Sequence, residues 1–541
     1  MLTFNLATEP WIPVLSGGTR TERSMGDALT GAPEFDGFAL DDPLQAVALL
    51  RQVLLPTVWA ALGVPRSEAE WAQRWRAGRF DAERIAAYLA EHADRFDLFH
   101  PVQPFAQVGG LRTAKDETKP TSVLLAAAAT GNNVPLFSAR TEGDPPPLTP
   151  AEAARALLAT HCWDTAAIKS GAVGDLAVKA GKTTGNPTGP LGNLGVVIPL
   201  GATLFETILL NTPIIRQGLR PEDRPQWSAP VATPAWSRRP ALGLLDLLTW
   251  QSRRIRLVPE TDQHDRTLVR RVVLAAGDRL APLPEDEPHT AWRQVDKPKP
   301  GEPPRRPIRH QPGRAPWRGM AALLATRADT AATVTTTALL QQLADLQALG
   351  HVPLDLPLQV LTVGVLYGNQ SAVVEDVMVD AMPLPIAALS PDSPVRQLLL
   401  DVADQADRLR DAANKLGDDL RLAAGGDKLP WDRSLRLGEA LVNEFTPVVR
   451  RMLAGLQRQP DRVDDAERAW KIVARRLAWA AAEPALAAAP PTAFLGRQQT
   501  EKLAHRLSLA EARYRTTITQ VLGSVDPDPA EPPLAESGAP R

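Results

Sequence analysis

The chain has 541 residues, is 44% hydrophobic and carries a net charge of −2, so it is long enough for several domains and a large core. This charge excludes a strongly basic protein that binds nucleic acid by its overall field alone, but it leaves room for local basic patches. The single cysteine, Cys162, excludes an intrachain disulfide and a cysteine-based zinc site. We see no signal peptide and no apolar run near the ~20 residues that span a bilayer, which predicts a cytoplasmic protein without a membrane contact.

The first predicted elements are a short strand or extended arm over residues 4–14 and a helix that begins at Asp42-Pro43. Aspartate caps helix starts and proline suits the first turn, so this pair marks the boundary well. Further helices are predicted over residues 67–78, 82–92 and 150–161. Between the last two, residues 113–150 read as a helix end followed by an exposed loop around Gly131.

The stretch "AVKAGKTTGNPTGPLGNLG", residues 177–195, is a glycine loop. Its residues Gly181-Lys182-Thr183 match the last three residues of a P-loop motif. A P-loop also requires a glycine five residues before Gly181, where this chain has Leu176, and a helix after the threonine. Pro187 and Pro190 lie where that helix should begin. The loop is therefore either a surface connection or a backbone that approaches a ligand closely.

Two basic regions follow the glycine loop. Arginines alternate with apolar residues from Arg253 to Arg271, which predicts two strands with a basic face. Residues 293–318 form a basic, proline-rich, extended insertion. For both regions, contact with nucleic acid and a merely solvated surface are open alternatives.

A polar turn interrupts the apolar stretch "LQVLTVGVLYGNQSAVVEDV", residues 358–377. Its centre, Gly368-Asn369-Gln370-Ser371, has the composition of a hairpin tip between two strands. On pattern alone, an ordinary turn explains it.

The character of the chain changes after residue 389. Four amphipathic segments, over 393–416, 431–457, 461–483 and 495–522, predict an up-and-down four-helix bundle. The predicted fold class is thus α+β, with a mixed domain with irregular loops over residues 1–388, the bundle over 389–525 and a disordered tail over 526–541.

No catalytic constellation is visible in the sequence. His161-Cys162 next to Asp164 suggests a thiol nucleophile only superficially, because adjacent helical side chains point in different directions. The histidines show no metal-ligand spacing. We therefore predict a non-enzymatic binding or scaffolding protein without a cofactor or metal.

Several stretches resemble the CasA family, the large subunit of the type I-E CRISPR surveillance complex, Cascade. These are "FNLATEPWIPV" (4–14), "DDPLQAVALL" (41–50), "PFAQV" (104–108), "IPLGATLFETILLN" (198–211) and "YGNQSAVVED" (367–376). The similarity is patchy but colinear. It implies a subunit that recognises the protospacer-adjacent motif through the minor groove of duplex DNA, opens the duplex to start R-loop formation, and recruits the helicase-nuclease.

The resemblance also implies functional residues. It assigns Asn369, Gln370 and Ser371 to a hairpin tip whose glutamine wedges into the duplex. The glycine loop matches by position and composition, and a basic residue should also enter the groove. The resulting DNA-binding candidates are Lys179, Gly181, Lys182, Gly185, Asn186, Arg270, Arg271, Asn369, Gln370 and Ser371.

The loop that carries Asn132, Asn133 and Phe137 resembles one that contacts the guide RNA and a neighbouring subunit. The implied partners are the other Cascade subunits, the guide RNA, double-stranded target DNA and the helicase-nuclease. Two rival hypotheses remain, a P-loop-like NTPase that uses Lys182-Thr183 and a generic helical adaptor without a DNA role.

Overall fold

The computed structural model describes residues 2–128, 130, 143–299, 303–326, 333–428, 436–500 and 503–523. The chain divides into two compact units. Unit 1 comprises Met1–Pro316 and Ala322–Pro391, and unit 2 comprises Trp317–Ala321 and Asp392–Arg541. The mixed architecture with a C-terminal helical bundle confirms the predicted α+β fold class.

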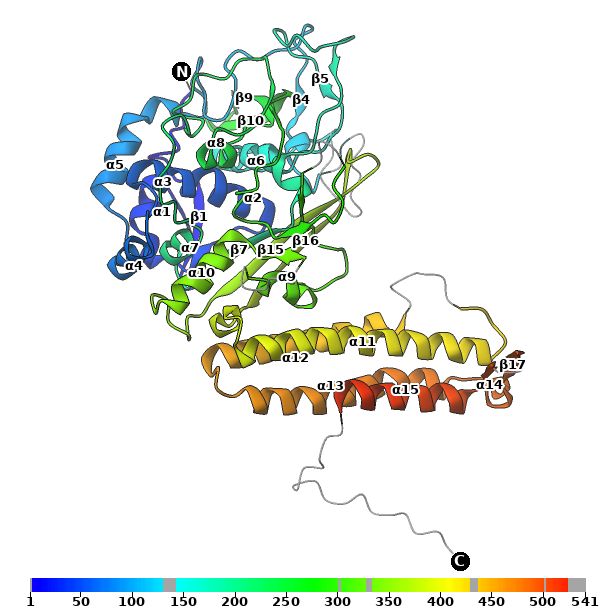
Figure 1. The fold of residues 1–541 in the computed structure, drawn as a ribbon. Coiled ribbons are helices and arrows are strands. Elements are labelled where there is room, and N and C mark those ends of the chain that lie inside the picture. The colour runs from blue at the N-terminus through cyan, green and yellow to red at the C-terminus, as the bar shows by residue number, and fades with distance from the viewer. Residues whose placement is uncertain are drawn as a thin grey trace, which may run out of the picture. The chain divides into compact units, whose positions relative to one another are not determined.

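Unit 1 combines short helices with several small sheets (Figure 1). Its helices are α1 (Met25–Thr30), α2 (Pro43–Leu49), α3 (Leu55–Leu62), α4 (Glu68–Ala77), α5 (Ala82–Glu91), α6 (Pro150–Trp163), α7 (Leu204–Leu210), α8 (Leu244–Leu248), α9 (Met320–Leu324) and α10 (Ala338–Ala348). The first two residues of α9 belong to unit 2.

The strands of unit 1 are mostly brief. They are β1 (Ile12–Ser16), β2 (Thr19–Arg23), β3 (Gly37–Phe38), β4 (Lys119–Pro120), β5 (Lys169–Ser170), β6 (Lys182–Thr183), β7 (Val196–Leu200), β8 (Arg238–Arg239), β9 (Arg253–Thr261), β10 (Thr267–Ala276), β11 (Arg279–Leu280), β12 (Trp292–Gln294), β13 (Arg305–Pro307), β14 (Val334–Thr335), β15 (Gln359–Gly368) and β16 (Val373–Pro383).

Side-chain caps explain why the predicted helices begin where they do. The Asp42 carboxylate accepts from the Leu44 amide at the start of α2, and the Ser67 hydroxyl accepts from the Glu70 amide at the start of α4. Thr149 and Glu152 form a reciprocal capping box on α6. Each cap satisfies amide groups that the helix itself leaves unpaired. The helices predicted from residues 42, 67, 82 and 150 are confirmed.

The helical stretch Pro43–Leu62 corrects one expectation. It contains α2, a π-helical turn over Leu50–Leu54 and α3, and it is long and apolar enough to cross a membrane by length and composition. Within the most apolar 18-residue window of this stretch, 78% is buried inside the protein. It is therefore a core helix, in which the apolar residues pack against the rest of unit 1.

The two predicted arginine-bearing strands, β9 and β10, are present, but the two arginines that open β9 are not part of a solvated basic face. Arg253 and Arg254 are buried, at 2% and 5% exposure. Both strands belong to a five-stranded sheet in which β10 also pairs with β4 and β5, and β5 pairs with β6. The alternation in the sequence could not show that long side chains from this strand would find acceptors in loops far along the chain.

Two further regions differ from the prediction. Residues 121–128 form a 3₁₀ turn and further turns rather than the end of an α-helix. The basic insertion contributes β12 and β13 to a three-stranded sheet with β14, so its described part is more ordered than a soluble loop. Here strand pairing between distant segments overrides a local composition rich in proline.

Unit 2 is a bundle of four long helices (Figure 1): α11 (Pro394–Ala423), α12 (Leu437–Arg458), α13 (Val463–Ala487) and α15 (Leu507–Leu522). Trp470 on α13 packs edge-on against Phe445 on α12, with ring centroids 5.1 Å apart, and its indole N–H donates to Gln405 on α11. The predicted bundle is confirmed. The helix predicted over 495–522 is wrong in its first part, where the short helix α14 (Pro491–Leu495) leads into a hairpin of β17 (Arg497–Thr500) and β18 (Leu503–His505).

The segment Trp317–Ala321 belongs to the bundle although it precedes the end of unit 1 in sequence. The Trp317 indole donates to Thr446, and Arg318 pairs with Asp407 on α11 at 2.8 Å. This segment thus passes from the predicted insertion into the bundle. The tail over 526–541 lies outside the described residues.

Candidate nucleic-acid interface

The predicted hairpin tip joins two of the long strands of unit 1, β15 and β16. Asn369, Gln370 and Ser371 have φ angles of 41°, 58° and 61°. Three successive residues other than glycine in the left-handed region are unusual, and such strain gathers at functional sites. The side chains of Asn369 and Gln370 are exposed. The strands therefore present an amide pair on a strained turn.

The tip is fastened to the segment that follows α6. The Ala166 amide donates to the Ser371 carbonyl at 2.8 Å, and the Tyr367 hydroxyl donates to the Trp163 carbonyl at 2.6 Å. We call residues 163–166 the α6 exit. These bonds hold the base of the tip. The described contacts reveal no role in folding for the Gln370 side chain.

The glycine loop begins with a tight basic turn. The Lys179 amide donates to the Lys182 carbonyl at 2.9 Å, and the Lys182 amide donates back at 3.0 Å. The central residues Ala180 and Gly181 have φ angles of 48° and 75°, as a type I′ turn requires. Both lysines are exposed, and neither has a carboxylate within ion-pair distance in the part of the chain that the structure describes.

Buried polar groups at the base of the loop set its shape. Asp175 accepts from the Thr183 hydroxyl at 2.8 Å and from the Ala177 amide at 2.8 Å. Asn186 is 6% exposed, and its amide nitrogen donates to the Thr183 carbonyl at 2.9 Å. We expected Asn186 to touch DNA, but this burial supports a role in holding the loop. Gly185 is exposed, with a φ of 67°.

The glycine loop also docks on the α6 exit. The Gly189 amide donates to the Asp164 carbonyl at 2.8 Å. A Cβ at Gly189 would lie 2.3 Å from the Cys162 carbonyl oxygen, so only glycine allows this close approach of two backbones. The hairpin tip and the glycine loop are thus tied to the same four residues, although Gly189 and Ser371 are 182 positions apart in sequence.

A buried charge cluster fixes the α6 exit itself. The Asp164 carboxylate accepts from the Lys169 ammonium at 2.6 Å and from the Arg253 guanidinium. Arg253 also donates to the carbonyls of Thr165 and Pro187, each at 2.8 Å. Burial alone would raise the pKa of Asp164, but the two cations hold that pKa below its usual value. Burial lowers the pKa of Lys169 to about 8.

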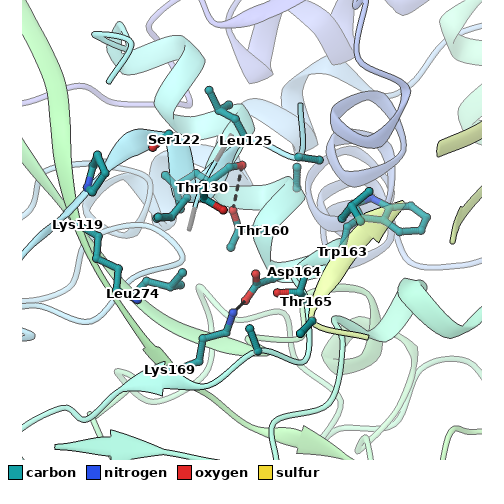
Figure 2. A pocket seen from close by; sticks show the side chains of 18 of the residues that line it. Lys119, Ser122, Leu125, Thr130, Thr160, Trp163, Asp164, Thr165, Lys169 and Leu274 are labelled. Atoms are coloured by element: carbon teal, nitrogen blue, oxygen red, sulfur yellow. Dashed lines mark hydrogen bonds and ion pairs between the residues drawn. The ribbon is translucent and has the colours of Figure 1, made fainter. Parts of the chain in front are cut away.

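A pocket of about 410 Å³ opens beside this cluster (Figure 2). Figure 2 shows the Lys169 ammonium directed at the Asp164 carboxylate, with Trp163 and Thr165 next to it and Lys119 across the pocket. Ala372 and Val374, from the β16 side of the hairpin, complete the lining. Residues of the α6 exit therefore line an open pocket at the foot of the hairpin and also anchor the glycine loop.

The remaining basic candidates lie on β10. Arg270 pairs with Glu260 on β9 at 2.7 Å, and the Arg271 guanidinium donates to the hydroxyl and carbonyl of Thr118. No described contact brings either arginine to the hairpin tip or the lysine turn. Asn132, Asn133 and Phe137 lie outside the described residues.

Two catalytic alternatives meet structural obstacles. Lys182 and Thr183 form the strand β6, and the next helical turn is a 3₁₀ turn at Pro190–Asn193, so a P-loop with its following helix is not formed. Cys162 is buried and accepts from the Gln52 amide, and burial raises its thiol pKa to about 12. Among the described residues, no group of three or more His, Cys, Asp or Glu could hold a metal ion.

Comparison with known proteins shows the family. The family described as "CRISPR-associated protein Cse1" matches residues 5–481, and the chain belongs to this family. CasA/Cse1 from Thermus thermophilus is 37% identical over 265 residues, which cover 48% of this chain and about half, 50%, of that relative. The solved structure of Thermobifida fusca Cse1 is 34% identical, covers 96% of this chain and 98% of that chain, and has a TM-score of 0.83.

A more distant likeness concerns the fold alone. A chain in a solved CRISPR RNA-guided surveillance complex is 21% identical, covers 96% of this chain and 100% of that chain, and has a TM-score of 0.65. The predicted resemblance to the CasA family is thereby confirmed.

Proposed function

We propose that this chain is the large subunit of a type I-E CRISPR RNA-guided surveillance complex and acts without catalysis of its own. In this proposal it recognises the protospacer-adjacent motif in duplex DNA, opens the duplex beside that motif, and recruits the helicase-nuclease. Its partners are the other Cascade subunits, the guide RNA and the target DNA, and it works in the cytoplasm.

The observation that carries the proposal is the common anchor of the two exposed elements. The hairpin tip bonds to the α6 exit through Ser371, and the glycine loop bonds to it through Gly189. A shared anchor fixes the spacing between the lysine turn and the Gln370 side chain. A protein that docks at one base pair and opens the next needs such a fixed spacing.

The chemistry of the two elements suits a minor groove. A groove ~6 Å wide admits a glycine-rich backbone turn more readily than bulky side chains. Exposed lysines at the edge of such a turn would meet the phosphates on either side. Separating a base step costs a few kcal/mol, and pairing with a guide RNA roughly balances the DNA duplex that it replaces.

We further propose a division of labour along the chain. Residues 1–388 would recognise DNA and dock on the guide-RNA complex, the bundle over 389–525 would contact partner subunits and displaced DNA, and 526–541 would be a disordered tail. The bundle expressed alone should be helical and melt cooperatively, and an unfolded fragment would contradict this boundary.

The central experiment separates docking from opening. Complex reconstituted with wild-type chain or with Gln370→Ala is footprinted with permanganate on fully paired DNA and on DNA with a pre-melted bubble beside the motif. We expect Gln370→Ala to fail on paired DNA and to bind the bubbled DNA normally, because the bubble removes the unstacking cost. Gln217→Ala, which truncates an exposed glutamine on another turn of unit 1, is the matched control.

Three outcomes would overturn parts of the proposal. Normal opening of paired DNA by Gln370→Ala would reduce the hairpin tip to an ordinary turn. Equal DNA binding by complexes with and without this subunit would favour a helical adaptor without a DNA role. Hydrolysis of ATP that Lys182→Ala abolishes would restore the NTPase hypothesis.

A further inference from the structure

Two arginines lie side by side on a small parallel sheet next to the glycine loop. In this sheet β8 pairs with β11, and Arg238 is in register with Arg279. Paired residues on adjacent strands share a face of the sheet, whereas successive residues along a strand alternate. Arg238 and Arg279 therefore share one face, and Arg239 belongs to the opposite face.

Arg279 lies over a tryptophan ring and bonds to the glycine loop. Its guanidinium lies 3.9 Å from the centre of the Trp236 ring, and Nη2 donates to the Thr184 carbonyl at 2.8 Å. A longer contact of 3.4 Å reaches the Asn186 side-chain oxygen. The Arg279 Nε and the Trp236 indole nitrogen are buried without an acceptor among the described residues. The indole ring and the Thr184 carbonyl together orient this side chain.

Positive charge is in excess on this face. Arg238 is exposed and forms no ion pair in the part of the chain that the structure describes. Burial lowers the pKa of Arg279. The positive charges of Arg253 and Arg238 lower this pKa further, and only Asp175 raises it. The exposed Lys182 extends the same excess of charge along the loop.

Arg239 shows the contrasting arrangement on the other face. It lies 4.1 Å from the centre of the Trp250 ring, and its two terminal nitrogens pair with the Asp246 carboxylate at 2.5 and 3.0 Å. Its charge is therefore neutralised by a neighbour. Arg238 and Arg239 are thus adjacent in sequence, but the protein supplies a counter-ion only to Arg239.

We propose that Arg238 and Arg279, together with Lys182, bind the phosphates of one DNA strand where the duplex passes the glycine loop. This inference rests on the proposed function and adds the strand contact that would orient the duplex. Guanidinium groups pair with phosphate through two parallel hydrogen bonds. A turn that enters a minor groove brings the residues flanking it to the phosphates at the groove edge.

The salt dependence of binding tests this proposal. Complex carrying a guide RNA that cannot pair with the probe isolates docking from R-loop formation. The probe is the fluorescent 40-base-pair duplex that wild-type complex enriches most from a library randomised beside the target site. Dissociation constants are measured from 50 to 300 mM KCl for wild type, Arg238→Gln and Arg239→Gln.

We expect Arg238→Gln to reduce the slope of log K against log salt by about 0.9, which corresponds to about eightfold weaker binding at 0.1 M salt. Arg239→Gln should leave the slope unchanged, because its charge is already paired. Arg279→Lys should keep the slope but weaken docking, since lysine keeps the charge and loses the stacked geometry.

Each other outcome overturns a defined part. An unchanged slope for Arg238→Gln overturns the phosphate contact, and reduced assembly with the guide RNA in the same variant would assign this face to a partner. Wild-type binding without any enriched motif contradicts the proposed function, while the slopes still decide the phosphate contact. Failure of wild-type complex to bind any duplex overturns both.

Discussion

The hairpin tip and the glycine loop solve the same structural problem in different ways. The tip stands on two strands of ten and eleven residues, whose ladder of backbone bonds holds it. The glycine loop has only the two-residue strands β5 and β6 and depends on buried side chains from distant segments. The conformation of the tip should therefore tolerate substitution of its exposed residues, whereas the conformation of the loop should be sensitive to substitution of buried residues well away from its surface.

The difference also concerns which atoms face outward. At the tip, the exposed groups that matter are side chains, above all Gln370. At the loop, the turn Lys179–Lys182 presents backbone and two flexible ammonium groups. If both elements act on one duplex, the tip should lose its function when a side chain is removed. The loop should lose its function when the buried side chains that hold its backbone are removed.

The largest expected effect is at the buried charge cluster that anchors the glycine loop. Arg253→Met leaves Asp164 with a single cation and leaves the Thr165 and Pro187 carbonyls without their donor. Removing one partner from a buried ion pair costs about 3–5 kcal/mol. Hydrogen exchange of peptides within residues 150–200 across a urea series should show this loss in unit 1.

Arg270→Met is the matched control, because Arg270 and Glu260 form a partly exposed pair. Such pairs contribute about 0–1 kcal/mol. Equal destabilisation by both variants would contradict the view that the buried cluster holds the α6 exit.

Acidification should weaken the same region. Burial lowers the pKa of His161, which precedes the α6 exit, from 6.5 to about 4. Between these values the unfolded chain binds a proton that the folded chain does not, so stability falls as the pH drops from 6.5 to 4. The shift corresponds to a loss on the order of 3 kcal/mol.

Urea unfolding at pH 7 and at pH 4.5 checks this pH dependence. His161→Gln removes the titrating group and should reduce the difference between the two conditions. His264→Gln changes an exposed histidine and should leave the difference as in wild type. A pH dependence that His161→Gln does not reduce would assign it to other groups.

A smaller effect is expected at Asp175, the staple of the glycine loop. Asp175→Ala removes the acceptor for the Ala177 amide and the Thr183 hydroxyl, a loss of about 1–2 kcal/mol. Duplex docking should weaken on paired and bubbled DNA alike, as measured by filter binding. Asp262→Ala removes a similar staple from the β9–β10 turn, where Asp262 accepts from two amides, and docking should persist.

The smallest effect separates side chain from backbone. Gln370→Gly should stabilise unit 1 by about 0.5–1 kcal/mol, because the relieved strain outweighs the added chain entropy, and it should abolish opening of paired DNA. Ala180→Gly relieves similar strain at a φ of 48° and should preserve docking. Loss of docking in Ala180→Gly would mean that the alanine methyl group, and not only the backbone turn, touches the ligand.

Local sequence signals determined the regular elements. The caps at Asp42, Ser67 and Thr149 act within three residues of themselves, and the hairpin and bundle follow from apolar periodicity. These interactions are short in range, so the residues that make them are visible together in the sequence. For the same reason the Asn369-Gln370 tip could be found as a turn between two strands.

Only the tertiary structure decided how those elements form a site. Arg253 had the pattern of a basic strand face, yet it is buried because Asp164, Thr165 and Pro187 supply acceptors 66 to 89 residues away. The same limit hid Asp175 and Arg279 and the shared anchor of tip and loop. A side chain that can be either solvated or buried is assigned by its partners, and those partners are defined only when distant segments of the chain have packed.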